Sequence, residues 1–158
     1  MSRLIAASLA LLFAACAGPS EAFVDPLQVH DLAGLVAEDL EGEFHELEAV
    51  DGPVALVFWQ TWCASCIREA PHAAAAAREH RGIRFFGVVS GTDEYVDDLE
   101  VERIAEEAGL GYPQLRDRDS SISDFFAVKA TPTIVVIDAD GRIAYRGHEL
   151  PDDWSRFE

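Results

Sequence analysis

The hydrophobic period changes twice within residues 54–89, and this change restricts the possible folds more than any other feature of the chain. Residues 54–59 are apolar on both faces of an extended chain, which is typical of a strand buried inside a sheet. From Cys63 onward the apolar residues recur at helical spacing, and Gly82 predicts the end of that helix. Residues 83–89 form a second apolar run. A strand, a crossover helix and a strand in this order predict parallel pairing with a right-handed connection.

The second half of the chain adds a helix and a hairpin to this unit. Residues 101–108 follow the pattern of a surface helix, which Gly109 should end. Residues 133–137 and 142–146 flank a tight turn and predict antiparallel strands at one side of a mixed sheet. Pro71 is expected to kink the first helix, because it lacks an amide hydrogen and clashes with the preceding turn. Shorter elements are expected in three further segments: a hairpin at 35–47, an extended piece at 112–115 and a short helix at 121–126.

The charge balance restricts the partners. A chain of 158 residues suits one domain with a buried core, and its 12 basic and 29 acidic residues give a net charge of −17. Nucleic acids and anionic membrane surfaces are also negatively charged, so this balance argues against both as partners. The histidines show no spacing typical of metal ligands.

The N-terminus has the layout of a secretory signal peptide. Arg3 supplies a positive charge, and residues 4–15 are an apolar run broken only by Ser8. A transmembrane helix needs about 20 apolar residues, so this run is too short to be a comfortable membrane span. We therefore expect residues 1–15 to be a signal peptide, and the protein to be exported to the periplasmic or extracytoplasmic face of a bacterial membrane.

Cys16 follows the small residues at the end of this run and resembles the cysteine of a bacterial lipobox. It would then be lipidated and become the first residue of the mature chain, with residues 16–33 as a tether and 34–158 as the folded domain. The lipid would be the only contact with the membrane. Phe13 departs from the usual leucine of that motif, so ordinary cleavage near Ala15–Ala17 stays open.

Cys63 and Cys66 are separated by two residues, and several kinds of site begin with such a pair. A c-type haem site is excluded because it needs a histidine directly after the second cysteine, where Ile67 stands. A zinc site needs four ligands, and His72 on the same helix is the one further candidate near the pair. A structural disulfide over so short a loop constrains the unfolded chain little. The pattern therefore favours a redox-active pair and predicts no bound metal.

The redox interpretation has a physical basis in the position of the pair. Cys63 lies where the apolar strand becomes a helix, so unpaired amide groups and the positive end of the helix dipole favour its thiolate. Cys66, one turn later, can attack a mixed disulfide formed at Cys63 and release the partner.

Two other classes of function stay open. The same thiols could bind Cu(I), a soft ion, or the domain could be a non-catalytic docking adaptor.

The residues around this pair resemble the thioredoxin superfamily, specifically its membrane-tethered TlpA/ResA-like branch. The resemblance covers residues 35–147. It depends on the pattern Trp-Cys-x-x-Cys-x-x-Glu-x-Pro, a later Thr-Pro-Thr and an Asp-Gly turn, which stand here at residues 62–71, 131–133 and 140–141. The family implies a three-layer α/β/α fold with a mixed central sheet. Its closing helix is expected to be shortened here, because residues 151–158 leave little room for it.

The resemblance also implies roles for individual residues. Cys63 would be the attacking, more exposed thiol, and Cys66 the buried, resolving thiol. Pro132 would be a cis-proline packed beside the disulfide, and Thr131 would present its backbone to an incoming chain. Trp62 would border the disulfide and shape the docking surface.

Glu69 is expected to act on the buried thiol. It follows Cys66 by three residues, so both side chains share one face of the helix. A carboxylate there could relay protons to the thiol or raise its pKa by charge repulsion. Thioredoxin itself places a buried aspartate on the preceding strand for this purpose, and Val57 occupies the matching position here. Trp59 is expected to pack in the core beneath the site.

The function that the resemblance implies is that of a thiol-disulfide oxidoreductase acting on protein thiols outside the cytoplasm. The Cys63–Cys66 disulfide would be its redox group, with no further cofactor. The branch favours a reductant, as in cytochrome c maturation, supplied with electrons by a membrane donor. The dipeptide Ala64-Ser65 between the cysteines is uncommon, and the reduction potential depends on it, so oxidant and isomerase roles stay open.

Overall fold

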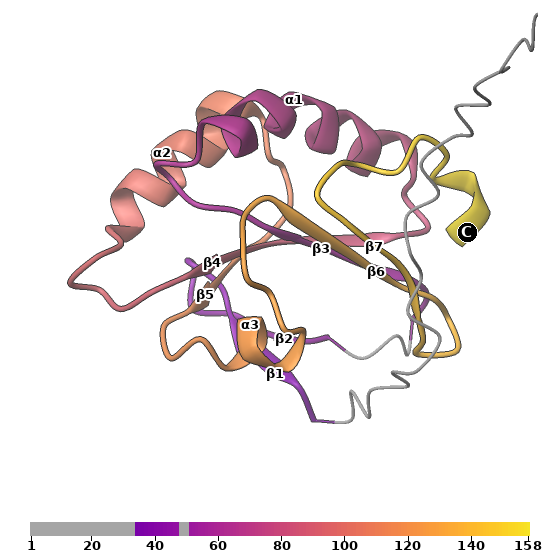
Figure 1. Ribbon diagram of the computed structural model, residues 1–158, viewed down its shortest axis with the longest axis horizontal. Coiled ribbons are helices and arrows are strands. Elements are labelled where there is room, and N and C mark those ends of the chain that lie inside the picture. The colour runs from indigo at the N-terminus through magenta and orange to yellow at the C-terminus, as the bar shows by residue number, and fades with distance from the viewer. Residues whose placement is uncertain (1–33, 48–50) are drawn as a thin grey trace, which may run out of the picture.

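A five-stranded mixed sheet forms the centre of the molecule (Figure 1). The computed structural model describes residues 34–47 and 51–158, and the expected signal peptide, Cys16 and tether lie outside them. The strands stand in the order β5-β4-β3-β6-β7. Their bounds are β3 (Val54–Phe58), β4 (Arg84–Ser90), β5 (Gln114–Asp117), β6 (Thr133–Ile137) and β7 (Ile143–Gly147). β4 is parallel to both β3 and β5, whereas β6 is antiparallel to both β3 and β7.

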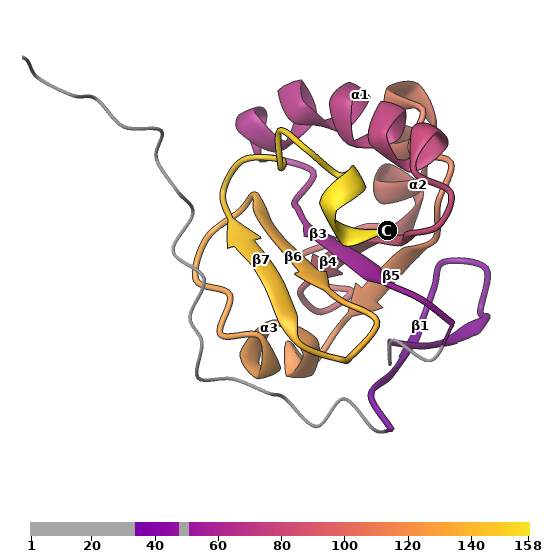
Figure 2. The ribbon, with the colours of Figure 1, turned by 90° about the vertical axis from the view of Figure 1, so that its right-hand side faces the viewer.

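Two long helices cover one face of the sheet, and a short helix with a hairpin covers the other (Figures 1 and 2). α1 (Ala64–Glu79) and α2 (Asp98–Ala108) lie on the first face. α3 (Ser121–Phe125) lies on the opposite face, with the antiparallel hairpin of β1 (Val36–Glu38) and β2 (Phe44–Glu46). This arrangement confirms the three-layer, thioredoxin-like α/β class and the parallel crossover from β3 through α1 to β4.

The core explains why β3 and β6 are apolar on both sides. Every residue of these two strands is buried. Side chains on the α3 side form one cluster, which includes Leu56, Phe58 and Phe126. Side chains on the α1 side form another, which includes Ala55 and Ile134. Burial of one large apolar side chain contributes about 1.5–3 kcal/mol, so these strands give the site a rigid base.

A single 3-10 turn, η1 (Ser155–Phe157), follows the last strand and agrees with the expected short C-terminal element. Trp154 and Phe157 are buried, and the ring of Trp154 lies 4.8 Å from that of Phe85 on β4. Tyr145 on β7 meets Phe157 with 6.3 Å between ring centroids. This aromatic group covers part of the α1 side of the sheet.

α1 ends at Glu79, three residues before Gly82, so the sequence-based end of this helix is wrong. His80 adopts φ −106° and ψ 67°, which lies outside the helical region. Its ring stacks on Trp154 with 6.5 Å between centroids, a contact with the far end of the chain. The helix itself continues on both sides of Pro71.

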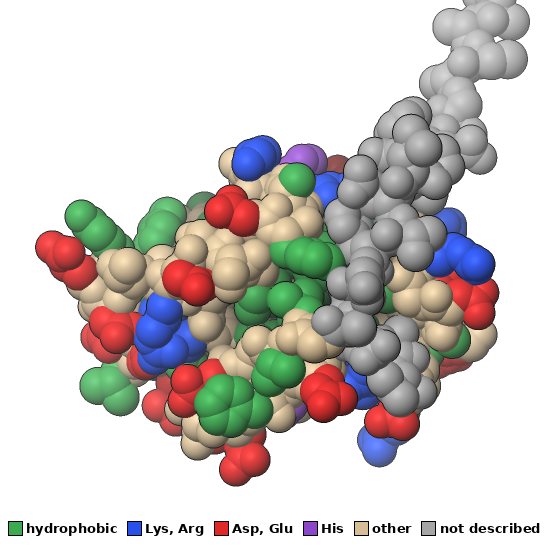
Figure 3. All heavy atoms as spheres, turned by 90° about the horizontal axis from the view of Figure 1, so that it is seen from below, with side chains coloured by type: hydrophobic (Ala, Val, Ile, Leu, Met, Phe, Trp, Pro, Cys, Tyr) green, Lys and Arg blue, Asp and Glu red, His purple; other side chains and the backbone are tan. Residues whose placement is uncertain are grey.

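The surface reflects the acidic composition. The face that carries α3 and the hairpin displays acidic side chains around a central group of hydrophobic side chains (Figure 3). Such a surface attracts cationic partners and repels anionic ones. None of the helices in the described ranges combines the length and the apolar character that crossing a membrane requires.

Asp39 holds the turn of the hairpin in place. Its carboxylate accepts a hydrogen bond from Nε2 of His45 at 2.6 Å. The backbone amides of Glu41 and Glu43 also donate to it, at 3.0 and 2.9 Å. Burial alone would raise the pKa of Asp39, but these hydrogen bonds outweigh burial and lower the pKa below its ordinary value.

We expect Asp39→Ala to lower the free energy of unfolding at neutral pH by about 2 kcal/mol. Because the pKa of Asp39 is lower in the folded than in the unfolded state, its stabilisation is complete above the unfolded value. The stabilisation is lost as the pH falls through the folded value. Urea unfolding at a series of pH values should therefore show the two proteins converging in acid. A difference that stays constant down to low pH would contradict this account.

Candidate functional site

Cys63 and Cys66 form a disulfide at the start of α1. Cys63 is the N-cap of the helix, and the Cα atoms of the two residues are 5.2 Å apart. Cys66 is only 4% exposed, whereas Cys63 is partly exposed. The structure therefore places Cys63 on the solvent side and Cys66 on the inside, as the family pattern implies.

Hydrogen-bond donors of α1 meet the sulfur of Cys63. The backbone amide of Cys66 donates to Cys63 Sγ at 3.2 Å, and the hydroxyl of Ser65 lies 3.4 Å from the same sulfur. The first turn of α1, all of it described, contains no acidic residue. An amide donor and the positive end of a helix both stabilise negative charge, so this position favours a thiolate.

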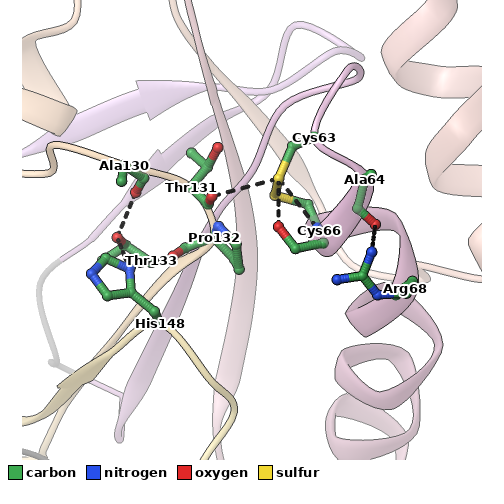
Figure 4. The surroundings of a disulfide bond; sticks show 10 residues. Cys63, Ala64, Cys66, Arg68, Ala130, Thr131, Pro132, Thr133 and His148 are labelled. Atoms are coloured by element: carbon green, nitrogen blue, oxygen red, sulfur yellow. Dashed lines mark hydrogen bonds between the residues drawn. A yellow bond between two sulfur atoms is a disulfide. The ribbon is translucent and has the colours of Figure 1, made fainter.

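The loop before β6 borders the disulfide from the other side (Figure 4). The peptide bond between Thr131 and Pro132 has the expected cis form. The carbonyl oxygen of Thr131 lies 3.6 Å from Sγ of Cys63. Both loop residues are partly exposed, so a chain that reaches the disulfide from solvent meets their backbone as well.

His148 supports this loop, and the site motif does not predict it. Its Nδ1 donates to the carbonyl oxygen of Pro132 at 2.7 Å and lies 3.4 Å from Oγ1 of Thr133 (Figure 4). The signal that could have revealed it is the strand register. Gly147, the last residue of β7, pairs with the second residue of β6, so the next residue comes beside the loop that precedes β6.

A cavity of about 20 Å³ lies between α1 and the sheet, next to Cys66. Most of its lining is apolar, and Cys66, Glu69 and Tyr112 are its titratable side chains. Glu69 is partly exposed, and its Oε2 lies 3.6 Å from Nδ1 of His72. Glu69 therefore borders the cavity on one side and solvent on the other. The structure brings it to the buried cysteine, as their shared helix face predicts.

The residues of the turn between β3 and α1 have different surroundings. Trp59 is buried, which confirms its expected place in the core, and its Nε1 donates to Oε1 of Gln114 at 2.9 Å. Trp62 is 64% exposed, so its indole is available at the rim of the disulfide. Gln60, for which the motif predicts no role, donates through Nε2 to the carbonyl oxygen of Ser90 at 2.9 Å. This bond ties the turn to the end of β4.

A larger, open depression of about 600 Å³ lies away from the disulfide. Its lining includes Arg78 and Arg81 from the end of α1 and the residues after it, but neither cysteine. Within residues 34–47 and 51–158, no three histidine, cysteine or carboxylate side chains are grouped to hold a metal ion. The candidate site therefore consists of the disulfide, the cis-proline loop, the cavity beneath them and Glu69.

Known proteins with similar sequences share this part of the chain. The model of the AhpC/TSA family matches residues 29–146. The chain is 34% identical to the thiol-disulfide oxidoreductase ResA of Halalkalibacterium halodurans over 111 residues, which cover 68% of this chain and 61% of that protein. ResA of Bacillus subtilis is 28% identical over 116 residues, which cover 72% of this chain and 63% of that protein. The chain thus spans less than two thirds of the length of these relatives.

Solved structures with the same fold extend the comparison. One is a secreted disulfide oxidoreductase of Mycobacterium tuberculosis, described as homologous to DsbE of E. coli, with a TM-score of 0.63 and 25% identity. The aligned part covers 74% of this chain and 84% of the chain in that structure. Another is StoA of Bacillus subtilis, with a TM-score of 0.62, 19% identity and coverage of 72% and 85%. At that identity StoA supports the fold alone.

Proposed function

Because the chain belongs to the AhpC/TSA family of thioredoxin-like proteins, we propose that it is a thiol-disulfide oxidoreductase that acts on other proteins outside the cytoplasm. The observation that carries this proposal is the Cys63–Cys66 disulfide, placed at the N-terminus of α1 and beside the cis peptide of Pro132. The names of the ResA relatives support the activity, and the secreted disulfide oxidoreductase supports the location.

In the reductive direction, the cycle begins with both thiols free and Cys63 as the thiolate. Its sulfur attacks one sulfur of a partner disulfide, so an S–S bond forms to Cys63 and the other partner sulfur leaves as a thiolate. Cys66 then loses its proton and attacks Sγ of Cys63, which restores the internal disulfide and releases the second partner thiolate. Two electrons pass to the partner, and its thiolates take up protons from solvent.

The partner is expected to dock at the rim of the disulfide. The exposed indole of Trp62 offers an apolar contact, and the partly exposed backbone of Thr131 and Pro132 offers hydrogen bonds to an extended chain. The net charge of −17 favours a partner with a neutral or basic segment around its cysteines.

The direction that we propose is reduction of the partner, in a role such as cytochrome c maturation, with electrons from a membrane donor. The support for this direction is the resemblance to the TlpA/ResA-like branch. The test is the reduction potential of the Cys63–Cys66 pair, measured in a glutathione buffer. A potential of about −270 mV indicates a reductant, and one of about −120 mV would indicate an oxidant.

We also propose that Glu69 controls the protonation of Cys66, since both side chains border the same small cavity. Glu69→Gln removes the negative charge and keeps the shape of the side chain. The pH midpoint of Cys66 thiolate formation should then fall by about half a unit, because a nearby carboxylate disfavours a second negative charge. The ultraviolet absorbance of the thiolate measures this midpoint. Glu79→Gln, at the last residue of α1, is the matched control and should leave it unchanged. If Glu69→Gln moves neither cysteine titration, the role is wrong.

The lipid anchor at Cys16 is part of the same proposal and gives the exported domain its membrane contact. Cys16 follows a short apolar run at the position where a lipobox cysteine stands. Bacterial cells that express the protein should incorporate a labelled fatty acid into it, and Cys16→Ser should abolish the label. An unlabelled wild type would reject the anchor without affecting the proposed disulfide exchange.

A further inference from the structure

Tyr112, just before β5, has a side chain that the mechanism above does not use. Its hydroxyl is buried and has no hydrogen-bond partner among the described residues. Burial raises the pKa of this phenol far above its ordinary value, so the hydroxyl keeps its proton at any physiological pH. A buried donor without a partner is unfavourable, and phenylalanine would fill the same space without that cost. The hydroxyl therefore needs an explanation.

Tyr112 lines the small cavity beside the buried cysteine. Tyr112 also lines two wide depressions that are open to solvent. The small cavity, which Cys66 and Glu69 also line, is more enclosed than either depression. Its volume of about 20 Å³ is sufficient for one water molecule. The lining from β3, from β6 and the loop before it, and from the chain beyond β7 is apolar: Val57, Pro132, Ile134 and Leu150.

Contacts that do not involve the hydroxyl hold Tyr112 in this position. Gln114 donates through Nε2 to the carbonyl oxygen of Tyr112 at 2.8 Å, while its Oε1 accepts from Trp59 at 2.9 Å. The side chain of Gln114 covers Gly87 on the neighbouring strand β4, where an added Cβ would clash with that Oε1. The ring of Phe85 packs beside the phenol ring with 5.8 Å between centroids. The hydroxyl is therefore free to serve a group in the cavity.

We propose that Tyr112 supplies the hydrogen bond that stabilises the thiolate of Cys66 when the disulfide is reduced, across the cavity that the two side chains share. This inference rests on the proposed oxidoreductase function and deepens it. In the disulfide, neither sulfur carries charge, so the donor has no strong acceptor. Reduction creates one, because Cys66 must lose its proton before it can attack the mixed disulfide. Tyr112 and Glu69 then act on the same sulfur in opposite directions: the hydroxyl favours the thiolate and the carboxylate disfavours it.

The test is a pH titration of the Cys66 thiol in the reduced full-length chain. Cys16→Ser and Cys63→Ser provide the background, so that Cys66 alone contributes thiolate absorbance. Adding Tyr112→Phe to this background should raise the pH midpoint by about one unit, since the thiolate loses a donor in an apolar site.

Tyr145→Phe is the matched control. It also removes a phenol oxygen from a buried tyrosine, but that oxygen donates to the carbonyl oxygen of Glu149 at 2.7 Å and does not border the cavity. The control should therefore leave the midpoint of Cys66 unchanged. An unmoved midpoint in Tyr112→Phe, or an equal shift in both variants, would overturn the inference.

Stability of the oxidised protein gives a second readout. Oxidised Tyr112→Phe should resist urea at least as well as the wild type, whereas Tyr145→Phe should be less stable because it loses a bonded donor. If Tyr112→Phe folds poorly or is destabilised when oxidised, the hydroxyl has a structural partner and the inference falls. The titration needs no partner protein. Its failure is thus distinguishable from failure of the proposed function, which would appear as a wild type that exchanges no disulfides.

Discussion

Replacing Cys63 by serine is expected to lower the rate at which the reduced protein cleaves a model protein disulfide by at least about a thousandfold. The N-cap position, the amide of Cys66 and the start of α1 all favour negative charge on the atom at this site. A serine hydroxyl does not ionise at neutral pH, so these groups would have no nucleophile to stabilise. Reduction of insulin, followed by the turbidity of its released chains, measures the rate.

Cys66→Ser is the informative companion variant. Its Cys63 can still attack a partner, but no internal thiol can release the product, so a mixed disulfide should accumulate. A non-reducing gel separates this species from the free protein. If Cys63→Ser retains activity, or if Cys66→Ser accumulates no mixed disulfide, the assigned order of the two thiols is wrong.

Asp117→Ala is expected to lower the free energy of unfolding by about 3 kcal/mol. The Asp117 side chain lies at the end of β5 in a residue that is 1% exposed. Its carboxylate accepts the amides of Ile122 and Ser123 at the start of α3, at 3.0 and 2.9 Å, and the hydroxyl of Ser90 at 3.0 Å. Alanine would leave the two amides without their acceptor. Because the carbonyl of Ser90 binds Gln60, the same loss would also loosen the turn that carries the cysteines.

Asp119→Ala is the matched control for this effect. Its carboxylate also accepts an amide near the start of α3, that of Ser121 at 3.0 Å, but it does so in an exposed position. Water can replace that acceptor, so the loss of stability should be much smaller than for Asp117→Ala. Urea unfolding of both variants at neutral pH makes the comparison. Equal losses would mean that burial does not set the contribution of Asp117.

Local patterns made the centre of the fold and the main site predictable. The change from a continuous apolar run to helical spacing is a property of neighbouring residues, so it revealed the β3–α1–β4 unit and the place of Cys63 at the helix start. Gly109 ends α2 in a left-handed conformation (φ 70°), as a C-terminal glycine predicts. Pro132 was predictable because a short motif marks it.

Contacts between distant parts of the chain account for what the sequence could not reveal. α1 ends at Glu79 because residues after it meet the C-terminal aromatic group. His148 reaches the cis-proline loop through the register of β6 and β7. Tyr112 lines the same cavity as Cys66 only because the segment before β5 packs near α1. No local pattern encodes such contacts, so each needed the assembled structure.

Pro71 divides α1 into two segments that need not open together. Proline has no amide hydrogen, so the carbonyl of Ile67 lacks the intrahelical bond that residue 71 would otherwise donate. The turn that carries the disulfide lies before this gap, and the buried alanines that anchor the helix, from Ala73 onward, lie after it. Local unfolding can therefore release the first turn while the rest of α1 stays protected from hydrogen exchange. The bond that is missing at Pro71 thus lies between the turn that carries the redox centre and the buried alanines of the same helix.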